Sequence, residues 1–134
     1  MPRPQPRFPE PDTQPFWDAT KEHKLTYQVC GNGHIIFYPR AFCPTCGSRD
    51  TTVKESAGQG TVYTYSVVRL NRHPAFAPLG PYAVAYVDLD EGFRILTNIV
   101  GVDDPLTDIK VGQHVKVAWE DQESGISLPM FAPA

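Results

Sequence analysis

The stretch CGNGHIIFYPRAFCPTCGS, residues 30–48, decides the fold of this 134-residue chain. Cys43 and Cys46 form a Cys-x-x-Cys turn, and Cys30 stands where a second turn of this kind would begin. Two such turns, separated by a short hairpin, build the closed tetrahedral site of a structural zinc ribbon. Position 33, where the second cysteine of the leading turn should stand, is glycine. A metal in this ribbon would therefore need its fourth ligand from another residue.

His34 is the natural substitute for the missing cysteine, because an imidazole reaches further from its Cα than a thiolate does. The glycines at 31 and 33 give the backbone the freedom that the longer spacer requires. A set of three cysteines and one histidine is an established structural zinc composition, and Asn32 is a poorer ligand. The sequence predicts Zn²⁺ bound by four residues: Cys30, His34, Cys43 and Cys46. A second interpretation stays open, in which His34 only begins a strand and the ribbon is degenerate and free of metal.

Short strands rich in β-branched and aromatic residues are expected on both sides of the leading turn, over 25–30 and 34–43. From Gly60 onward the pattern is entirely that of strands. These are expected at 60–70, 82–90, 93–101 and 109–121 and in the last apolar stretch, 126–134, with a tight hairpin turn at 90–92. Five strands in about 75 residues predict a small Greek-key barrel of the OB type.

The chain divides into three expected parts. Residues 1–25 form a Pro-rich arm and a short helix over 14–24, residues 26–56 the zinc ribbon with one atypical turn, and residues 57–134 the OB-fold barrel. The helix carries Phe16 and Trp17, but its apolar face is too sparse for an independent helix. It has to dock either on this chain or on a partner, and both possibilities stay open.

Charge and composition restrict the function. Residues 57–134 hold five Lys and Arg against nine Asp and Glu, whereas residues 1–56 hold seven against six. An acidic barrel is a poor surface for nucleic acid, whose phosphates are bound by Lys and Arg. No run approaches the roughly 18 apolar residues of a membrane span, and the N-terminal segment has no apolar stretch of a secretory signal. Three cysteines, two of them in one turn, fit reduced thiols. We expect a cytoplasmic protein that binds neither nucleic acid nor membrane.

No catalytic site is expected. A nucleophilic cysteine needs a base within hydrogen-bond reach, and Cys30 with His34 is the only local pairing of this type. Roles as metal ligands account for all three cysteines together. No nucleophile elbow, phosphate-binding loop or dinucleotide fingerprint occurs in the chain. The protein is therefore expected not to be an enzyme by itself.

One loop has the composition of a binding surface. Residues 71–81, NRHPAFAPLGP, are Pro-rich and apolar and join the first two expected barrel strands, where OB barrels often build their binding sites. Phe76 and Leu79 are its apolar side chains. The alternative is a loop that only folds back over the end of the barrel. Arg40 of the ribbon is a candidate contact for a phosphate or a carboxylate, or else a solvated side chain.

Four motifs occur in a characteristic order: FW (16–17), PRAFCPTCGS (39–48), GQGTVYTYSVV (58–68) and LPMFAP (128–133). In this order they resemble a family of zinc-ribbon and OB-fold accessory proteins that was long filed as a domain of unknown function and described as acyl-CoA-associated. The resemblance runs from Phe16 to Pro133, nearly the whole chain. The chain departs from the family pattern in the leading turn, where the family usually carries Cys-x-x-Cys.

The resemblance implies a mainly β fold, with an N-terminal helix and a rubredoxin-like zinc ribbon followed by a five-stranded OB-fold barrel. It implies a small non-catalytic subunit of a hetero-oligomer whose other subunit is a thiolase-like enzyme: a thiolase, an acyltransferase or an aldolase of lipid or steroid metabolism. Such a subunit helps assemble the complex and shape its channel, with acyl-CoA at or near the interface. Candidate contacts with the partner or with CoA are Phe16, Trp17, Arg40, Phe76 and Leu79. The rival interpretation is a nucleic-acid-binding protein with the same two folds.

Overall fold

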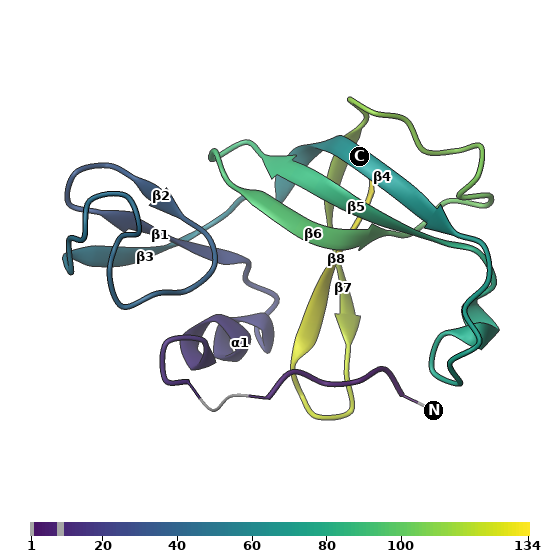
Figure 1. Cartoon of the computed structure of the whole chain (residues 1–134), viewed down its shortest axis with the longest axis horizontal. Helices are drawn as coiled ribbons and strands as arrows, with labels where there is room; N and C mark the ends of the chain where they lie inside the picture. Colours follow the sequence, from purple (N-terminus) through teal and green to yellow (C-terminus); the bar gives the residue numbers. More distant parts are fainter. Residues whose placement is uncertain (1, 8–9) are drawn as a thin grey trace.

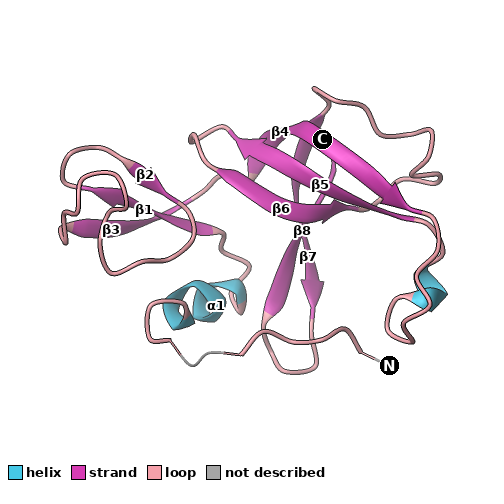
Figure 2. Cartoon of the chain, viewed as in Figure 1, coloured by secondary structure: helices cyan, strands magenta, loops and turns pink. Residues whose placement is uncertain are grey.

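The structure, a computed structural model, describes residues 2–7 and 10–134. A small ribbon and a barrel lie side by side, and helix α1 lies beneath the space between them (Figure 1). Strands make up most of the regular structure (Figure 2). The elements are α1 (Gln14–Thr20), β1 (Thr26–Cys30), β2 (Ile35–Ile36), β3 (Thr51–Glu55), β4 (Gln59–Val68), the 3₁₀ turn η1 (Ala77–Leu79), β5 (Tyr82–Leu89), β6 (Arg94–Ile99), β7 (His114–Asp121) and β8 (Ser127–Pro133). Neither helical segment of the described ranges has the length or the hydropathy that crossing a membrane requires.

The ribbon is a three-stranded sheet in the order β2-β1-β3, and all of its pairs are antiparallel. The strand expected over 34–43 is much shorter than predicted, because the chain leaves the sheet after Ile36. Phe37 turns toward the barrel, and Pro39 has no N–H with which to continue the ladder. The third strand of this sheet, β3, was not expected from the sequence.

The second sheet is a closed barrel with the strand order β4-β5-β6-β8-β7. Its strands alternate between buried and exposed side chains, so that residues such as Val87, Ile95 and Phe131 fill the interior. Antiparallel pairing joins β4 to both β5 and β7, which closes the barrel. The predicted mainly β class, with a helix, a ribbon and a five-stranded barrel, is confirmed.

Helix α1 docks on its own chain. It ends at Thr20, four residues earlier than predicted, and a left-handed residue, His23 with φ 57°, follows. The Phe16 side chain is only 9% exposed and belongs to the main core. Thr20 is fully buried, and its hydroxyl accepts a 3.2 Å hydrogen bond from the backbone N–H of Ser127 in β8. Of the two docking possibilities, contact with this chain is the one that the structure shows.

A second contact holds the end of the helix against the β7–β8 hairpin. The His23 Nε2 atom lies 2.6 Å from the Asp121 Oδ1 atom, and the His23 ring stacks on Trp119 at 5.5 Å. The Ser127 hydroxyl donates to the same carboxylate. These partners, Ser127 first and His23 second, hold the pKa of Asp121 below its ordinary value. Although histidine, aspartate and serine meet here, Ser127 and His23 both bind the carboxylate, so this is no nucleophile–base pair.

A set of aromatic rings joins helix, ribbon and barrel, and we call it the aromatic joint. Phe37 of the ribbon stacks on Phe93 of the β5–β6 hairpin at 4.8 Å, and Tyr27 of β1 stacks on the same ring at 5.1 Å. Phe16 of α1 meets Phe37 edge-on at 5.8 Å and Trp17 at 5.1 Å. The joint fixes the three parts relative to one another.

The linker between ribbon and barrel is pinned by Glu91. The Ser56 hydroxyl donates to one carboxylate oxygen of Glu91 at 2.7 Å, and the Ala57 backbone N–H donates to the other at 2.8 Å. Gly58 follows with φ +73°, and a Cβ at this position would lie 2.5 Å from Val117 Cγ1. The backbone of the linker therefore packs closely against the Val117 side chain, and the linker is not a free hinge.

The described part of the N-terminal arm, residues 2–7, runs along the β7–β8 hairpin (Figure 1). Arg3 donates to both carboxylate oxygens of Glu120 at 2.8 and 3.3 Å. The Gln5 amide donates to the Gln122 side chain at 2.9 Å. Through these two polar side chains the arm binds the chain's own barrel.

We expect Glu91→Ala to destabilise the protein, because two donors at the linker lose a charged acceptor. Hydrogen bonds to charged groups contribute about 1.5–3 kcal/mol each, so the melting temperature should fall clearly. Glu123→Ala, at an exposed carboxylate of the β7–β8 turn, is the control and should leave it unchanged. Circular dichroism melts of both variants measure the difference, and equal melting temperatures would contradict the role given to Glu91.

The depressed pKa of Asp121 predicts a pH dependence of stability. The folded state favours the carboxylate, so this contribution is fully present above the ordinary pKa of about 3.9 and is lost as pH falls through the folded value. Asp121→Asn should lower the melting temperature at pH 7, and the gap from the wild type should narrow in acid. Asp103→Asn, at an exposed loop carboxylate, is the control. A gap that stays constant with pH would contradict the assignment.

Candidate metal centre

Four potential ligands meet at the end of the ribbon. Cys30 ends β1 and His34 directly precedes β2, whereas Cys43 and Cys46 come from the long loop that leads to β3. One ligand atom from each residue lies within 4.8 Å of all the others. Cys43 is fully buried, Cys30 is buried, His34 is half-buried and Cys46 is exposed. The structure thus brings together the four residues that the sequence nominates.

The distances between these atoms fit a tetrahedral zinc ion. The Cys30 and Cys46 sulfurs are 3.8 Å apart, and the His34 Nδ1 atom lies 3.3 Å from the Cys30 sulfur and 3.7 Å from the Cys43 sulfur. Zn–S bonds of about 2.3 Å and Zn–N bonds of about 2.0–2.1 Å would place two thiolates about 3.8 Å apart and a thiolate and an imidazole about 3.6 Å apart. The donor set and these three distances fit a closed structural site.

The glycine at the missing-cysteine position explains how His34 reaches the site. Gly33 has φ +85°, a left-handed conformation that side chains rarely adopt. Its N–H donates to the Cys30 carbonyl at 2.9 Å, and the Cys30 N–H donates to the His34 carbonyl at 3.0 Å. In the second turn the left-handed glycine, Gly47 at φ +74°, comes after the second cysteine, and its N–H donates to the Cys43 carbonyl at 2.8 Å. The two potential ligands of the leading turn are four residues apart and those of the second turn three, so the leading turn closes with a longer side chain.

The environments of the thiols differ. The Asn32 amide donates to the Cys46 sulfur at 3.4 Å, and this bond, followed by one from the Ser48 backbone, lowers the pKa of the Cys46 thiol to about 6. Burial raises the pKa of the Cys30 thiol. Asn32, the poorer ligand in the sequence, is therefore a hydrogen-bond donor to a ligand sulfur, and it favours the thiolate that a metal would bind.

The other candidate residues do not gather in one place. Phe16 is part of the aromatic joint, so little of its ring is available to a partner, and Trp17 beside it is half-buried. Phe76 is half-buried against Tyr82, whereas Leu79 is 45% exposed on the same loop. This loop lies at the end of the barrel far from the ribbon (Figure 1).

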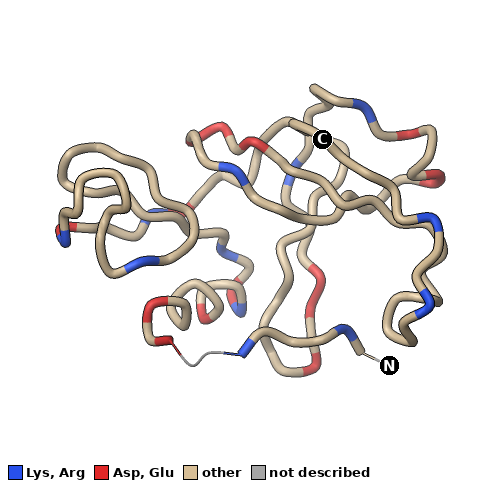
Figure 3. The backbone as a smooth tube through the Cα atoms, viewed as in Figure 1, with Lys and Arg blue, Asp and Glu red and all other residues tan. Residues whose placement is uncertain are grey.

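Arg40 is exposed on the ribbon. Its backbone, rather than its side chain, is fixed: its N–H and its carbonyl both bind the Gln28 amide, at 3.0 and 3.1 Å. Within the described ranges its guanidinium forms no ion pair. Basic residues are scattered in Figure 3 and do not form a continuous stripe on the face in view. Arg40 is thus a single exposed cation on a mixed surface.

An apolar surface lies on the outer face of the barrel, and two of its residues, Tyr86 and Leu96, were not nominated from the sequence. Tyr63, Tyr86 and Leu96 are exposed on β4, β5 and β6, and Tyr86 pairs directly with Leu96. Arg94 lies over the Tyr63 ring at 3.6 Å and is held there by Asp88. The alternation of inward and outward side chains along β5 and β6 could have indicated that Tyr86 and Leu96 point outward, because every second residue of these strands is buried.

Models of known protein families match both halves of the chain. The family model of the "ChsH2, rubredoxin-like zinc ribbon domain" matches residues 17–52, and that of the "ChsH2, C-terminal OB-fold domain" matches residues 53–120. A "DUF35 domain-containing scaffold protein" of Pyrococcus furiosus is 35% identical over 118 residues, which cover 84% of this chain and 85% of that protein.

Two further relatives are subunits of enzymes by name. A "Probable enoyl-CoA hydratase alpha subunit" of Thermomonospora curvata is 40% identical over 121 residues; these are 89% of this chain but only 37% of that protein. A chain of the solved "Ltp2-ChsH2(DUF35) aldolase" superposes with a TM-score of 0.83 and 36% identity, covering 96% of this chain and 98% of that one. The resemblance found in the sequence is confirmed, and the chain belongs to the DUF35 family of scaffold proteins, with the zinc ribbon and OB-fold domain of ChsH2.

Proposed function

We propose that this protein is a non-catalytic accessory subunit of a thiolase-like enzyme that acts on acyl-CoA or related substrates in the cytoplasm. The observation that carries the proposal is the match of 96% of the chain, at 36% identity, to nearly all of a chain in the Ltp2-ChsH2(DUF35) aldolase. A relative named as a scaffold protein, matched over 85% of its length, supports the same role. In this role the chain helps assemble the complex and shape the channel for substrate, with acyl-CoA at or near the interface.

Exposed apolar side chains support a role in assembly. Leu70 and Leu79 are both exposed in the loop between β4 and β5, and Tyr38 and Phe42 are exposed within five residues of each other on the ribbon. Exposed apolar side chains that gather in one segment, unlike singly scattered ones, favour contact with another protein. We assign Leu79 and Phe76 of the loop, Trp17 of the helix and Arg40 of the ribbon as candidate contacts with the partner or with CoA. The Phe16 ring contributes indirectly, because it anchors the helix that carries Trp17.

We further propose that Cys30, His34, Cys43 and Cys46 bind a structural zinc ion. Four protein ligands leave no open position for a substrate, so the ion would join the two turns of the ribbon rather than take part in a reaction. The spacing of the sulfur and nitrogen atoms supports this assignment, as does the Asn32 amide directed at the Cys46 sulfur. The metal-free interpretation of the ribbon becomes one outcome of the test below.

Purified protein should contain about one zinc per chain by elemental analysis. Cys43→Ser should release the metal and unfold the ribbon, because metal binding and folding are coupled. In a chelator competition Asn32→Ala should weaken zinc retention by roughly 10–100-fold, as expected for a hydrogen-bond partner of a ligand. His34→Ala, which removes a ligand, should weaken it more. Metal-free wild-type protein with a folded ribbon would contradict the assignment, as would equal retention by the two variants.

Complex formation tests the proposed function. We expect co-expression with a thiolase-like enzyme, sought first among the products of neighbouring genes, to give a hetero-oligomer on a sizing column. Leu79→Asp should weaken the complex about tenfold or more if the loop is an interface anchor. Because Leu79 is half-exposed, its change should leave the melting temperature of the isolated chain unaltered. Leu106→Asp, at a comparably exposed leucine of another loop, is the control.

Two results would count against this account. If Leu79→Asp and the control bind the enzyme like the wild type, the loop is not part of the interface. If no complex forms and the chain instead binds single-stranded nucleic acid tightly in a filter assay at moderate salt, the rival function is correct. The acidic balance of residues 57–134, five basic against nine acidic, makes that second result unexpected.

A further inference from the structure

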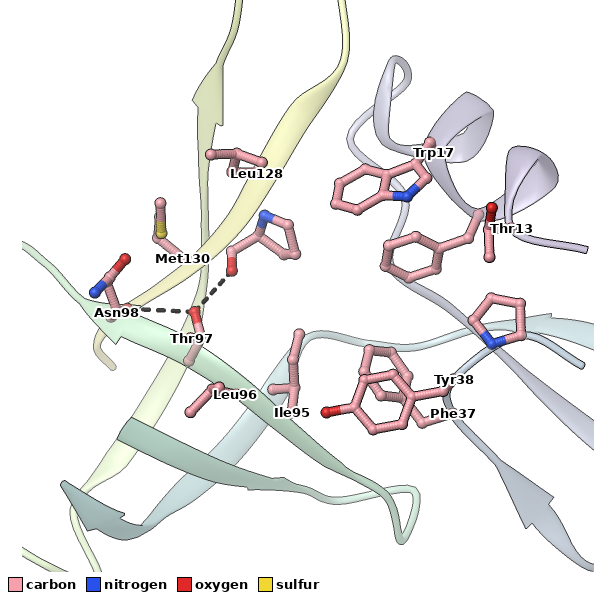
Figure 4. A pocket seen from close by; sticks show the side chains of 13 residues that line it. Thr13, Trp17, Phe37, Tyr38, Ile95, Leu96, Thr97, Asn98, Leu128 and Met130 are labelled. Carbon is pink, nitrogen blue, oxygen red and sulfur yellow. Dashed lines mark hydrogen bonds between the residues drawn. The ribbon is translucent and has the colours of Figure 1, made fainter. Parts of the chain in front are cut away.

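A cavity of about 360 Å³ lies where helix, ribbon and barrel meet. One wall consists of the aromatic rings of Phe16, Trp17, Phe37 and Tyr38, and the opposite wall includes Leu128 and Met130 of β8. The labelled rings of Trp17 and Tyr38 lie across an open space from the aliphatic side chains of the barrel (Figure 4). We call this cavity the α1 pocket. The aromatic joint forms part of its wall, so the pocket is built from three parts that are fixed relative to one another.

The α1 pocket lies against two barrel strands whose backbone pairing is short. Strands β6 and β8 pair at a single position, Ile99 with Phe131. Two residues earlier in β8 stands Pro129, which has no N–H to donate, so the parallel ladder cannot continue in that direction. The Thr97 hydroxyl binds the Pro129 carbonyl at 2.7 Å in place of a backbone donor. The short pairing of these strands beside the pocket therefore follows from the sequence of β8.

The chemistry of the walls restricts what can bind. None of the thirteen lining residues is Asp, Glu, Lys, Arg or His. Two of the polar side chains already have partners in the chain: Thr97 binds Pro129, and the Asn98 amide donates to the Ala83 carbonyl at 2.8 Å. A charged group placed here would lose its hydration without gaining a counter-ion. A hydrocarbon group would instead be removed from water against rings and methyl groups, which is favourable.

The size and the outlet of the pocket fit part of a larger molecule. A volume of about 360 Å³ is near the lower end of the roughly 300–1,000 Å³ of ligand sites. That is enough for a hydrocarbon group but not for a whole coenzyme thioester. A second hollow shares Leu96, Leu128 and Met130 with the α1 pocket and extends along the barrel to Phe76. A ligand seated in the α1 pocket can therefore leave its polar part outside.

We propose that the α1 pocket binds the uncharged hydrocarbon part of an acyl thioester, while the coenzyme remains outside it. This inference rests on the proposed function, which supplies the thioester as the ligand class. The apolar walls and the absence of a charged lining residue supply the specificity for hydrocarbon. The chain would then bind two things: the acyl group of the substrate, and the enzyme that converts this substrate.

Isothermal titration of the purified full chain with decanoyl-CoA tests the proposal, with coenzyme A alone as the matched ligand. We expect saturable binding of decanoyl-CoA and binding of coenzyme A that is weaker by about tenfold or more, because the buried chain supplies the affinity. The fluorescence of Trp17 is measured in a Trp119→Phe background, in which Trp17 is the one remaining tryptophan. Quenching or a spectral shift of this fluorescence locates the ligand at the helix wall. Equal affinities for the two ligands would overturn the proposal.

Two variants fill the space from different sides. Leu128→Trp narrows the pocket from β8, and Leu96→Trp narrows its mouth from a half-exposed position. If one of the two variants fails to fold, ligand binding can still be measured with the other. Each should weaken decanoyl-CoA binding by about tenfold or more. Leu106→Trp, at an exposed leucine that does not line the pocket, should bind like the wild type. If the tryptophan variants fold and bind decanoyl-CoA as tightly as the wild type, the proposal is wrong.

Complex formation by the same variants separates this inference from the proposed function. If the filled variants lose decanoyl-CoA but still form the hetero-oligomer, the pocket is a ligand site. If they keep decanoyl-CoA and lose the enzyme partner, a side chain of the partner occupies the pocket and the proposal is wrong. Decanoyl-CoA binding to a wild-type chain that forms no complex would support the pocket while contradicting the accessory-subunit function.

Discussion

The aromatic joint is the contact on which the rest of the structure depends. Phe37 comes from the ribbon, and its ring centroid lies 4.8 Å from that of Phe93 in the barrel and 5.8 Å from that of Phe16 in the helix. Aromatic pairs contribute about 0.5–1.5 kcal/mol each beyond the burial of their surface. The ribbon has only a small core of its own, formed by Cys30, Ile36 and Cys43. Packing of its rings against the barrel therefore orients the ribbon, and this orientation places Tyr38 and Trp17 around the α1 pocket.

The ribbon brings four potential ligands together although one turn lacks its second cysteine. Gly33 stands at that position, and its backbone is left-handed. The His34 Nδ1 atom, one residue later in the sequence, lies 3.7 Å from the Cys43 sulfur. The imidazole thus lies where the sulfur of a second cysteine is expected, so that both turns end at one point.

The elements that depend on local pattern could be predicted from the sequence. The spacing of Cys30, Cys43 and Cys46 and the alternation in the barrel strands were sufficient for the ribbon and for the five-stranded barrel. Features that depend on tertiary pairing were not visible. Alternation places Tyr63 and Tyr65 on one face, but a bulge between Val62 and Thr64 leaves Tyr63 exposed and directs the Tyr65 hydroxyl to the Ile109 carbonyl. The α1 pocket was equally hidden, because its walls come from segments that are distant in the sequence.

The central claim is that this chain supports a reaction it does not perform. The most direct measurement is turnover of an acyl-CoA substrate by the thiolase-like partner alone, by this chain alone and by the two together at equal concentrations. The account predicts no turnover by the chain alone, and activity or soluble yield of the partner that is markedly higher when the chain is present. Turnover by the isolated chain would contradict it, and so would full activity and solubility of the partner without the chain.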